Sequence, residues 1–225
     1  MRSLRLIATL LGLFLLAACG AQESPAPPPA PSEQQRPPAA GTGGCQRVQA
    51  PAPREDADRK APEEALDEDA TYTATVRTNC GDFAFELDTE AAPKAAASFA
   101  ALARDGYFKD TVFHRIVPGF VIQGGDPTAT GSGGPGYKTK DRPPSDATYG
   151  KGVVAMAKAE DEDPGTSGSQ FYVVTADDAG LPPEYAVLGK VTSGMDVVER
   201  IGMLGDASEQ PTQPVVVESV EIAES

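Results

Sequence analysis

From residue 70 onward, the chain consists largely of short segments of strand length separated by turns with Gly, Pro and Asn, and in the first two of these segments apolar and polar residues alternate. Alternation with a period of two is the pattern of a strand that buries one face. Residues 71–78 and 82–88 flank the turn Asn79-Cys80-Gly81 and predict a β-hairpin. Further strands are predicted at residues 111–117, 119–124, 152–157, 169–175, 185–191 and 214–222.

Two other segments have the features of helices. Residues 92–108 are rich in alanine, carry Pro93 at their start and reach a stop signal at Gly106. Residues 194–203 predict a second, shorter helix. Eight strands with two helices predict a mainly β fold, a closed eight-stranded antiparallel barrel capped by the two helices, over residues 70–225.

The first 69 residues differ in composition and are not expected to belong to the barrel. The chain begins with the positively charged residues Arg2 and Arg5, followed by an apolar run. The run ends at Leu16-Ala17-Ala18-Cys19, which resembles the bacterial lipoprotein box. That resemblance implies that residues 1–18 are a signal peptide and that Cys19 is lipidated, which would anchor an extracytoplasmic protein to the membrane. An ordinary secretory signal is the alternative. Residues 19–69 predict a Pro/Ala-rich and charged tether, with a helical turn or two over 53–70.

Cys45 and Cys80 remain once Cys19 is assigned to lipid. Outside the cytoplasm two such thiols most often pair, so a disulfide is expected to pin the approach segment to the barrel. Two free, shielded thiols are the alternative. No metal is expected, because two cysteines and one distant histidine make a poor ligand set.

Charge and motifs exclude several classes of function. A net charge of −14 argues against nucleic acid as a partner, because phosphate binding needs clustered Lys and Arg. Residues 131–136, GSGGPG, match the G-x-G-x-x-G sequence motif of dinucleotide-binding sites. That motif must be followed by a helix, which Pro135 and the segment after it prevent. We therefore expect a glycine-rich surface loop and no cofactor. Nothing supports tight self-association, so a monomer is expected.

The segment FHRIVPGFVIQGGD, residues 113–126, contains the only histidine of the chain. Strand alternation predicts that Arg115 shares a surface with Gln123 of the returning strand, while His114 lies on the opposite side. A lone histidine on a barrel strand is more often a hydrogen-bonded structural residue than a catalyst, and no triad partner is visible. Arg115 is therefore the stronger candidate for the chemical centre.

Five segments, in this order and spacing, resemble the cyclophilin-type peptidyl-prolyl cis–trans isomerases: FHRIVPGFVIQGGD, GSGGPGY, GVVAMAK, TSGSQFYVV and YAVLGKV. The resemblance covers residues 70–225 and implies an eight-stranded barrel that acts on proline-containing polypeptides. It implies catalytic roles for Arg115, Phe120 and Gln123, with the arginine assisting the twist of the X-Pro bond and no proton transfer. It places along the substrate groove Val121, Ala157, Lys158, Gln170, Tyr172, Leu181 and Tyr185. Phe113 and Phe171 fall outside the family's pocket positions and are assigned to the barrel core.

The sequence departs from the family pattern at several of these positions. Val121 stands where methionine is common, Lys158 where asparagine is frequent, and Tyr185 where histidine is often found. Gly180 falls where many members carry a tryptophan important for cyclosporin, which puts tight inhibition by that drug in doubt. The expected function is isomerisation that assists the folding of exported proteins. The alternative is a catalytically weak binding module or chaperone for proline-containing segments.

Overall fold

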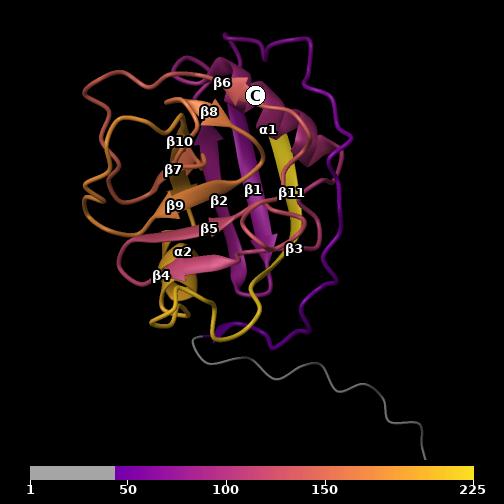
Figure 1. Ribbon diagram of the computed structural model, residues 1–225, viewed down its shortest axis with the longest axis vertical. Helices are drawn as coiled ribbons and strands as arrows, with labels where there is room; N and C mark the ends of the chain where they lie inside the picture. The colour runs from indigo at the N-terminus through magenta and orange to yellow at the C-terminus, as the bar shows by residue number, and fades with distance from the viewer. Residues whose placement is uncertain (1–43) are drawn as a thin grey trace, which may run out of the picture. The chain divides into compact units, whose positions relative to one another are not determined.

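The computed structural model describes residues 44–225, so the predicted signal peptide, Cys19 and the first part of the tether lie outside the described range. An antiparallel sheet of nine strands forms the body of the domain (Figure 1). In spatial order its strands are β3 (Thr111–Val112), β11 (Val216–Glu224), β1 (Tyr72–Thr78), β2 (Gly81–Leu87), β10 (Val187–Ser193), β7 (Val153–Met156), β9 (Phe171–Val174), β5 (Val121–Gly124) and β4 (Arg115–Val117). A separate pair joins β6 (Thr139–Lys140) and β8 (Thr166–Ser167).

The mainly β fold with two helices is confirmed, and the sheet differs from the prediction in strand number and closure. The single strand predicted over 111–117 is two strands, because the chain changes partner within it: Val112 pairs with Val216, whereas Arg115 pairs with Gln123. Two residues thus carry the chain from one edge of the sheet to the other. The sheet curls into an approximate barrel, and no ladder joins β3 to β4 within residues 44–225.

The two helices pack on the sheet and complete its main core. Helix α1 (Pro93–Arg104) begins at Pro93 as predicted, and the buried carboxylate of Asp141 accepts a hydrogen bond from the Ala95 N–H at its first turn (2.6 Å). Phe99 of α1 lies edge-on to Phe171 of β9, with ring centroids 5.5 Å apart. Helix α2 (Met195–Gly202) buries Val198 and Ile201. Across residues 44–225, neither helix has the length and apolar character needed to cross a membrane.

Strands β5, β7 and β9 are buried on both faces. Along β9, Phe171 and Val173 point into the main core, whereas Tyr172 and Val174 join a second apolar cluster on the other face. This is the alternation expected of a strand. Phe120, Leu181 and other partly buried side chains pack against the second cluster. It follows that the outer face of these three strands is a second, smaller core, and the candidate site is built on it.

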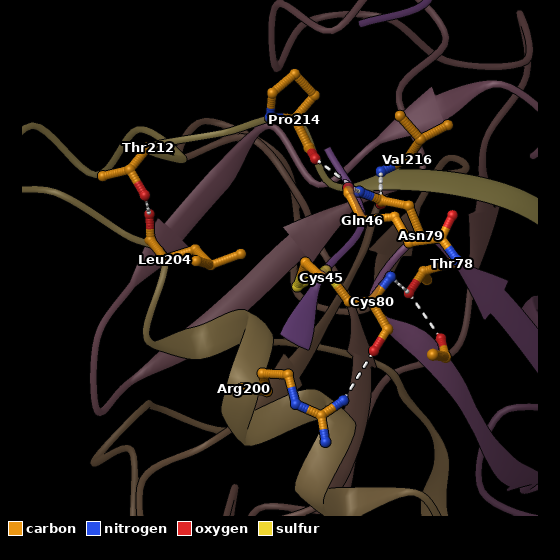
Figure 2. The surroundings of a disulfide bond; sticks show 11 residues. Cys45, Gln46, Thr78, Asn79, Cys80, Arg200, Leu204, Thr212, Pro214 and Val216 are labelled. Carbon is orange, nitrogen blue, oxygen red and sulfur yellow. Dashed lines mark hydrogen bonds between the residues drawn. A yellow bond between two sulfur atoms is a disulfide. The ribbon is translucent and has the colours of Figure 1, made fainter. Parts of the chain in front are cut away.

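A segment over residues 44–70, here called the strap, runs along the outside of the domain (Figure 1). Cys45 is bonded to Cys80, which confirms the predicted disulfide. Figure 2 shows Asn79 beside this bond, where its side-chain amide donates to the backbone oxygens of Gln46 (2.7 Å) and Pro214 (3.1 Å). The bridge therefore joins the start of the strap to the β1–β2 turn.

The rest of the strap is held by hydrogen bonds rather than by regular structure. The backbone N–H groups of Arg54 and Arg59 donate to the oxygens of Pro127 and Pro135, both at 3.0 Å. The Arg54 guanidinium also donates to the backbone oxygens of Tyr107 and Lys109. Residues 53–70 contain no helix, so the predicted helical turn is wrong. Backbone groups that bond to the domain are not available to form a helical turn.

Candidate active site

A cavity of about 270 Å³ opens over the second apolar cluster. Arg115 and Gln123 are cross-strand partners in β4 and β5, and both side chains reach this cavity. The residues that line it are Arg115, Phe120, Val121, Gln123, Ala157, Lys158, Tyr172, Leu181 and Tyr185. The structure therefore brings together nine of the ten residues that the sequence placed at the catalytic centre and groove.

Arg115 lies at the surface rather than in the core. Its side chain is 34% exposed, and its Nε donates to Oε2 of Glu209 at 2.6 Å. Its Nη1 lies 3.4 Å from Oε1 of Gln123, which makes this second hydrogen bond a long one. Within residues 44–225 no hydrogen bond engages Nη2. The guanidinium is thus held along one edge and keeps donors for a group in the cavity.

A chain of side-chain amides links Arg115 to the glycine-rich loop. Gln123 Nε2 donates to Oε1 of Gln170 (3.1 Å), and Gln170 Nε2 donates to the backbone oxygen of Gly133 (3.0 Å). Gln170, the tenth predicted residue, therefore lines the neighbouring cavity and reaches Arg115 through Gln123.

The loop that ends this chain is fixed by one buried carboxylate. Asp126 accepts hydrogen bonds from the backbone N–H groups of Thr128, Gly131 and Gly133. Burial alone would raise the pKa of Asp126, but these hydrogen bonds outweigh it and lower the pKa. Glycine is required at 133, because a Cβ atom there would lie 2.1 Å from a carboxylate oxygen of Asp126. The segment 131–136 is a loop, as predicted, and its order comes from Asp126.

A second cavity of about 330 Å³ adjoins the first and shares Gln123, Ala157 and Lys158 with it. Lys158 does not present a free cation to either cavity. Its side chain is 4% exposed, pairs with Glu184 at 3.2 Å and lies 5.7 Å from the ring centroid of Tyr185. Sequence analysis did not identify Lys138 and Glu162, which form an ion pair (2.8 Å) at the second cavity. Neither residue lies in a recognisable motif.

Three tyrosines support the first cavity. Tyr185 lies edge-on to Tyr172 and to Tyr149, with ring centroids 5.6 and 5.9 Å apart. The Tyr149 hydroxyl donates to the backbone oxygen of Tyr185 (2.7 Å) and accepts from its N–H (3.0 Å). The buried Tyr172 hydroxyl has no hydrogen-bond partner in the described part of the chain, and burial raises its pKa. Tyr172 is therefore a neutral wall of the cavity.

His114 lines neither cavity. Both its ring nitrogens are buried, and among residues 44–225 the Val112 backbone is the one backbone group that interacts with them, without the geometry of a good hydrogen bond. Burial lowers the pKa of His114, against the opposing attraction of Asp126.

Phe113 and Phe171 are buried in the main core, with ring centroids 5.9 Å apart, as predicted. Among residues 44–225 no group of three His, Cys, Asp or Glu side chains could hold a metal ion.

Comparison with known proteins decides the family. The model of the family described as cyclophilin type peptidyl-prolyl cis-trans isomerase/CLD matches residues 73–222. The chain belongs to this family. The cyclophilin-type isomerases similar to it include peptidyl-prolyl cis-trans isomerase ppi1 of Schizosaccharomyces pombe, 40% identical over 147 residues, which are 63% of this chain and 93% of the relative. Peptidyl-prolyl cis-trans isomerase A of Mycobacterium tuberculosis is 40% identical over 173 residues, covering 68% of this chain and 93% of that protein.

Solved cyclophilin structures agree with this assignment. The crystal structure of a cyclophilin type peptidyl-prolyl cis-trans isomerase from Cryptosporidium parvum matches with a TM-score of 0.63 and 34% identity, over 68% of this chain and 98% of that one. A structure of the same protein in the presence of the dipeptide Ala-Pro matches with a TM-score of 0.62 and 35% identity, over 67% and 98%. The part of the chain that the family model matches, residues 73–222, begins after the strap.

Proposed function

We propose that this cyclophilin isomerises X-Pro bonds by binding the proline ring in the 270 Å³ cavity and donating a hydrogen bond from Arg115 to the twisted bond. The observation that supports this most directly is the position of the guanidinium, which lines the same cavity as the apolar side chains of Phe120 and Leu181. One related Cryptosporidium structure was solved in the presence of the dipeptide Ala-Pro, which contains the kind of bond that this cavity would bind.

The chemistry needs a fixed cation and no proton transfer. Rotation of a peptide bond has a barrier of about 18–20 kcal/mol, because resonance between nitrogen and carbonyl is lost. Ahead of proline the cis and trans ends are nearly equal in free energy, so a catalyst has only to bind the twisted form more tightly. The twisted nitrogen carries a lone pair that can accept a hydrogen bond. Arg115 can donate to it at any working pH, because arginine stays protonated.

The apolar walls and the arginine would contribute separately. A hydrogen bond from a charged group is worth about 1.5–3 kcal/mol, which corresponds to about one to two decades of rate. The rest of the acceleration would come from the proline ring held against Phe120, Tyr172 and Leu181 with water excluded. Arg115→Ala should therefore lower kcat/KM by about 10- to 100-fold and leave peptide affinity largely intact.

The deciding experiment is a peptide isomerisation assay on residues 44–225 and on Arg115→Ala, with peptide binding measured by calorimetry for both. Arg115→Lys is the matched variant, which keeps the charge and loses the planar fork. Equal rates for the wild type and Arg115→Ala would reject the mechanism. Tight peptide binding by a wild type without measurable isomerisation would favour the alternative, a binding module for proline-containing segments.

We further propose that the enzyme works outside the cytoplasm, anchored by lipid on Cys19, on the proline-containing segments of exported proteins. The disulfide supports an oxidising compartment, and the sequence that ends at Cys19 has the form of a lipoprotein signal. Detergent phase partition of the full chain tests the anchor. Wild type should enter the detergent phase and Cys19→Ser should not; a wild type that stays in the aqueous phase would overturn it.

A further inference from the structure

The loop that follows α2, residues 205–212, lies along β4, the edge strand that carries Arg115 (Figure 1). The backbone oxygen of Glu209 accepts a hydrogen bond from the N–H of Ile116 at 2.9 Å. At the other end of the loop, a Cβ atom on Gly205 would lie 2.3 Å from the backbone oxygen of Ile116. Two close contacts with the same residue of β4 therefore fix the register between the loop and Arg115.

The loop is also held from within. The carboxylate of Asp206 accepts hydrogen bonds from the N–H groups of Ser208 (2.8 Å) and Gln210 (3.0 Å). The Asp206 N–H donates to the backbone oxygen of Gln210, and the Glu209 N–H donates to that of Asp206. This is a turn closed by four hydrogen bonds, so the backbone of Glu209 has a defined position before its side chain is considered.

That position is unfavourable for a residue with a side chain. Glu209 has a φ of 63°, in the left-handed region. After a turn of this kind the left-handed position is ordinarily glycine, because a Cβ atom crowds the following carbonyl. A glutamate kept there against backbone preference is a local strain of the sort that is found at functional sites. Its side chain makes the shortest hydrogen bond of Arg115, 2.6 Å from Oε2 to Nε.

We infer that Glu209 is a positioning residue for the isomerase reaction: it holds the guanidinium of Arg115 so that the Nη donors face the proline cavity. Glu209 is not among the residues that line this cavity, so it would act through Arg115 and not on the substrate. By occupying Nε it leaves Nη1 and Nη2 as the only donors that Arg115 can offer. The inference rests on the proposed catalytic role of Arg115.

The first test is Glu209→Gly in the peptide assay. The substitution removes the carboxylate and places glycine where the backbone favours it, so the melting temperature should not fall. We expect kcat to fall about two- to fivefold while KM stays within about twofold, since a partly exposed ion pair is lost and the cavity is untouched. A merely structural residue would move stability and kcat together.

Asp110→Gly is the matched control. Asp110 is an exposed acid with a φ of 60°, outside both cavities, so this variant also replaces an acid by glycine at a left-handed position but does not touch Arg115. Its kcat should equal that of the wild type.

Glu209→Gln keeps an oxygen that can accept from Nε and should give an intermediate kcat. Raising the ionic strength from about 0.05 to 0.5 M should lower the kcat of the wild type toward that of Glu209→Gln, because salt screens the exposed pair.

The double variant Arg115→Ala, Glu209→Gly separates the two proposals. If Glu209 acts through Arg115, its substitution has no further effect once Arg115 is gone. A normal kcat in Glu209→Gly, a raised kcat, or an equal loss in the Arg115→Ala background would overturn the positioning role. Unchanged activity in Arg115→Ala alone would instead overturn the proposed mechanism.

Discussion

At the scale of single residues, the hydroxyl of Tyr172 is a buried polar group that binds nothing within residues 44–225. Its ring is useful as a wall of the proline cavity, whereas its hydroxyl loses water without gaining a partner. Tyr172→Phe should therefore raise the free energy of unfolding by about 1–2 kcal/mol, measured by urea denaturation. The isomerase activity should stay within about twofold, because the ring is retained.

Tyr149→Phe is the control, since it makes the same change where the hydroxyl both donates to and accepts from the backbone of Tyr185. This variant should lose about 1 kcal/mol of stability and loosen the wall formed by Tyr185. Equal destabilisation by the two substitutions would contradict the assignment of Tyr172 as unpartnered.

The residues of the site differ in how far sequence could reveal them. Arg115, Gln123 and Tyr172 lie in short motifs on neighbouring strands, and strand alternation then brings their side chains to one surface. Glu209 is separated from Arg115 by 94 positions. It is an exposed glutamate in a turn, and nothing in the local amino-acid sequence indicates a left-handed φ or a contact with β4. Such a contact depends on how the loop docks, which only the tertiary structure determines.

At the scale of elements, the strap is expected to depend on its disulfide. The Cys45–Cys80 bridge spans 35 positions, and closing a loop of that length is worth about 3–4 kcal/mol on the chain-entropy account. The double variant Cys45→Ala, Cys80→Ala should lose about that much free energy of unfolding and become more sensitive to protease over residues 47–66. The peptide isomerisation rate at 10 °C should persist, since neither cysteine lines the cavities.

Arg47→Ala serves as the reference for this experiment, because Arg47 is an exposed strap residue whose side chain forms no hydrogen bond or ion pair within residues 44–225. It should leave both stability and protease sensitivity unchanged. An unchanged urea midpoint in the cysteine variant would mean that the contacts of Arg54 hold the strap without help from the bridge.

The strands also show which structural features hydrophobic periodicity predicts correctly and which it does not. Residues 71–88 form the predicted hairpin, because alternation and the turn agree with the local contacts. Within the segment 111–117, Phe113 and Ile116 both point into the main core although they are three positions apart, so strand alternation breaks where the chain changes partner. Hydrophobic periodicity carries no information about which strand lies alongside. The approximate closure of the barrel depends on that change, so the prediction of a single strand was wrong at the place where the two edges of the sheet meet.

At the scale of the whole molecule, the pH dependence of the free energy of unfolding near neutral pH can be assigned to one side chain, because the sequence contains a single histidine. Burial lowers the pKa of His114 in the folded protein, so the unfolded chain binds a proton more readily below about pH 6.5. The free energy of unfolding should therefore fall as the pH drops from about 6.5 toward the folded pKa, by at most about 1.4 kcal/mol per pH unit. Asp126 adds nothing in this range, because its lowered pKa shifts its own loss of stability to more acidic conditions.

Urea denaturation between about pH 5 and 7 measures this slope, with His114→Gln as the variant that should flatten it. The isomerase rate should stay nearly constant between about pH 6 and 8, since the proposed reaction transfers no proton and arginine side chains remain charged throughout this range. Stability and catalysis would thus respond differently to the same acidification, because the buried histidine lies outside the two cavities. A rate that drops steeply through about pH 6.5 and recovers in His114→Gln would instead place the histidine in the reaction.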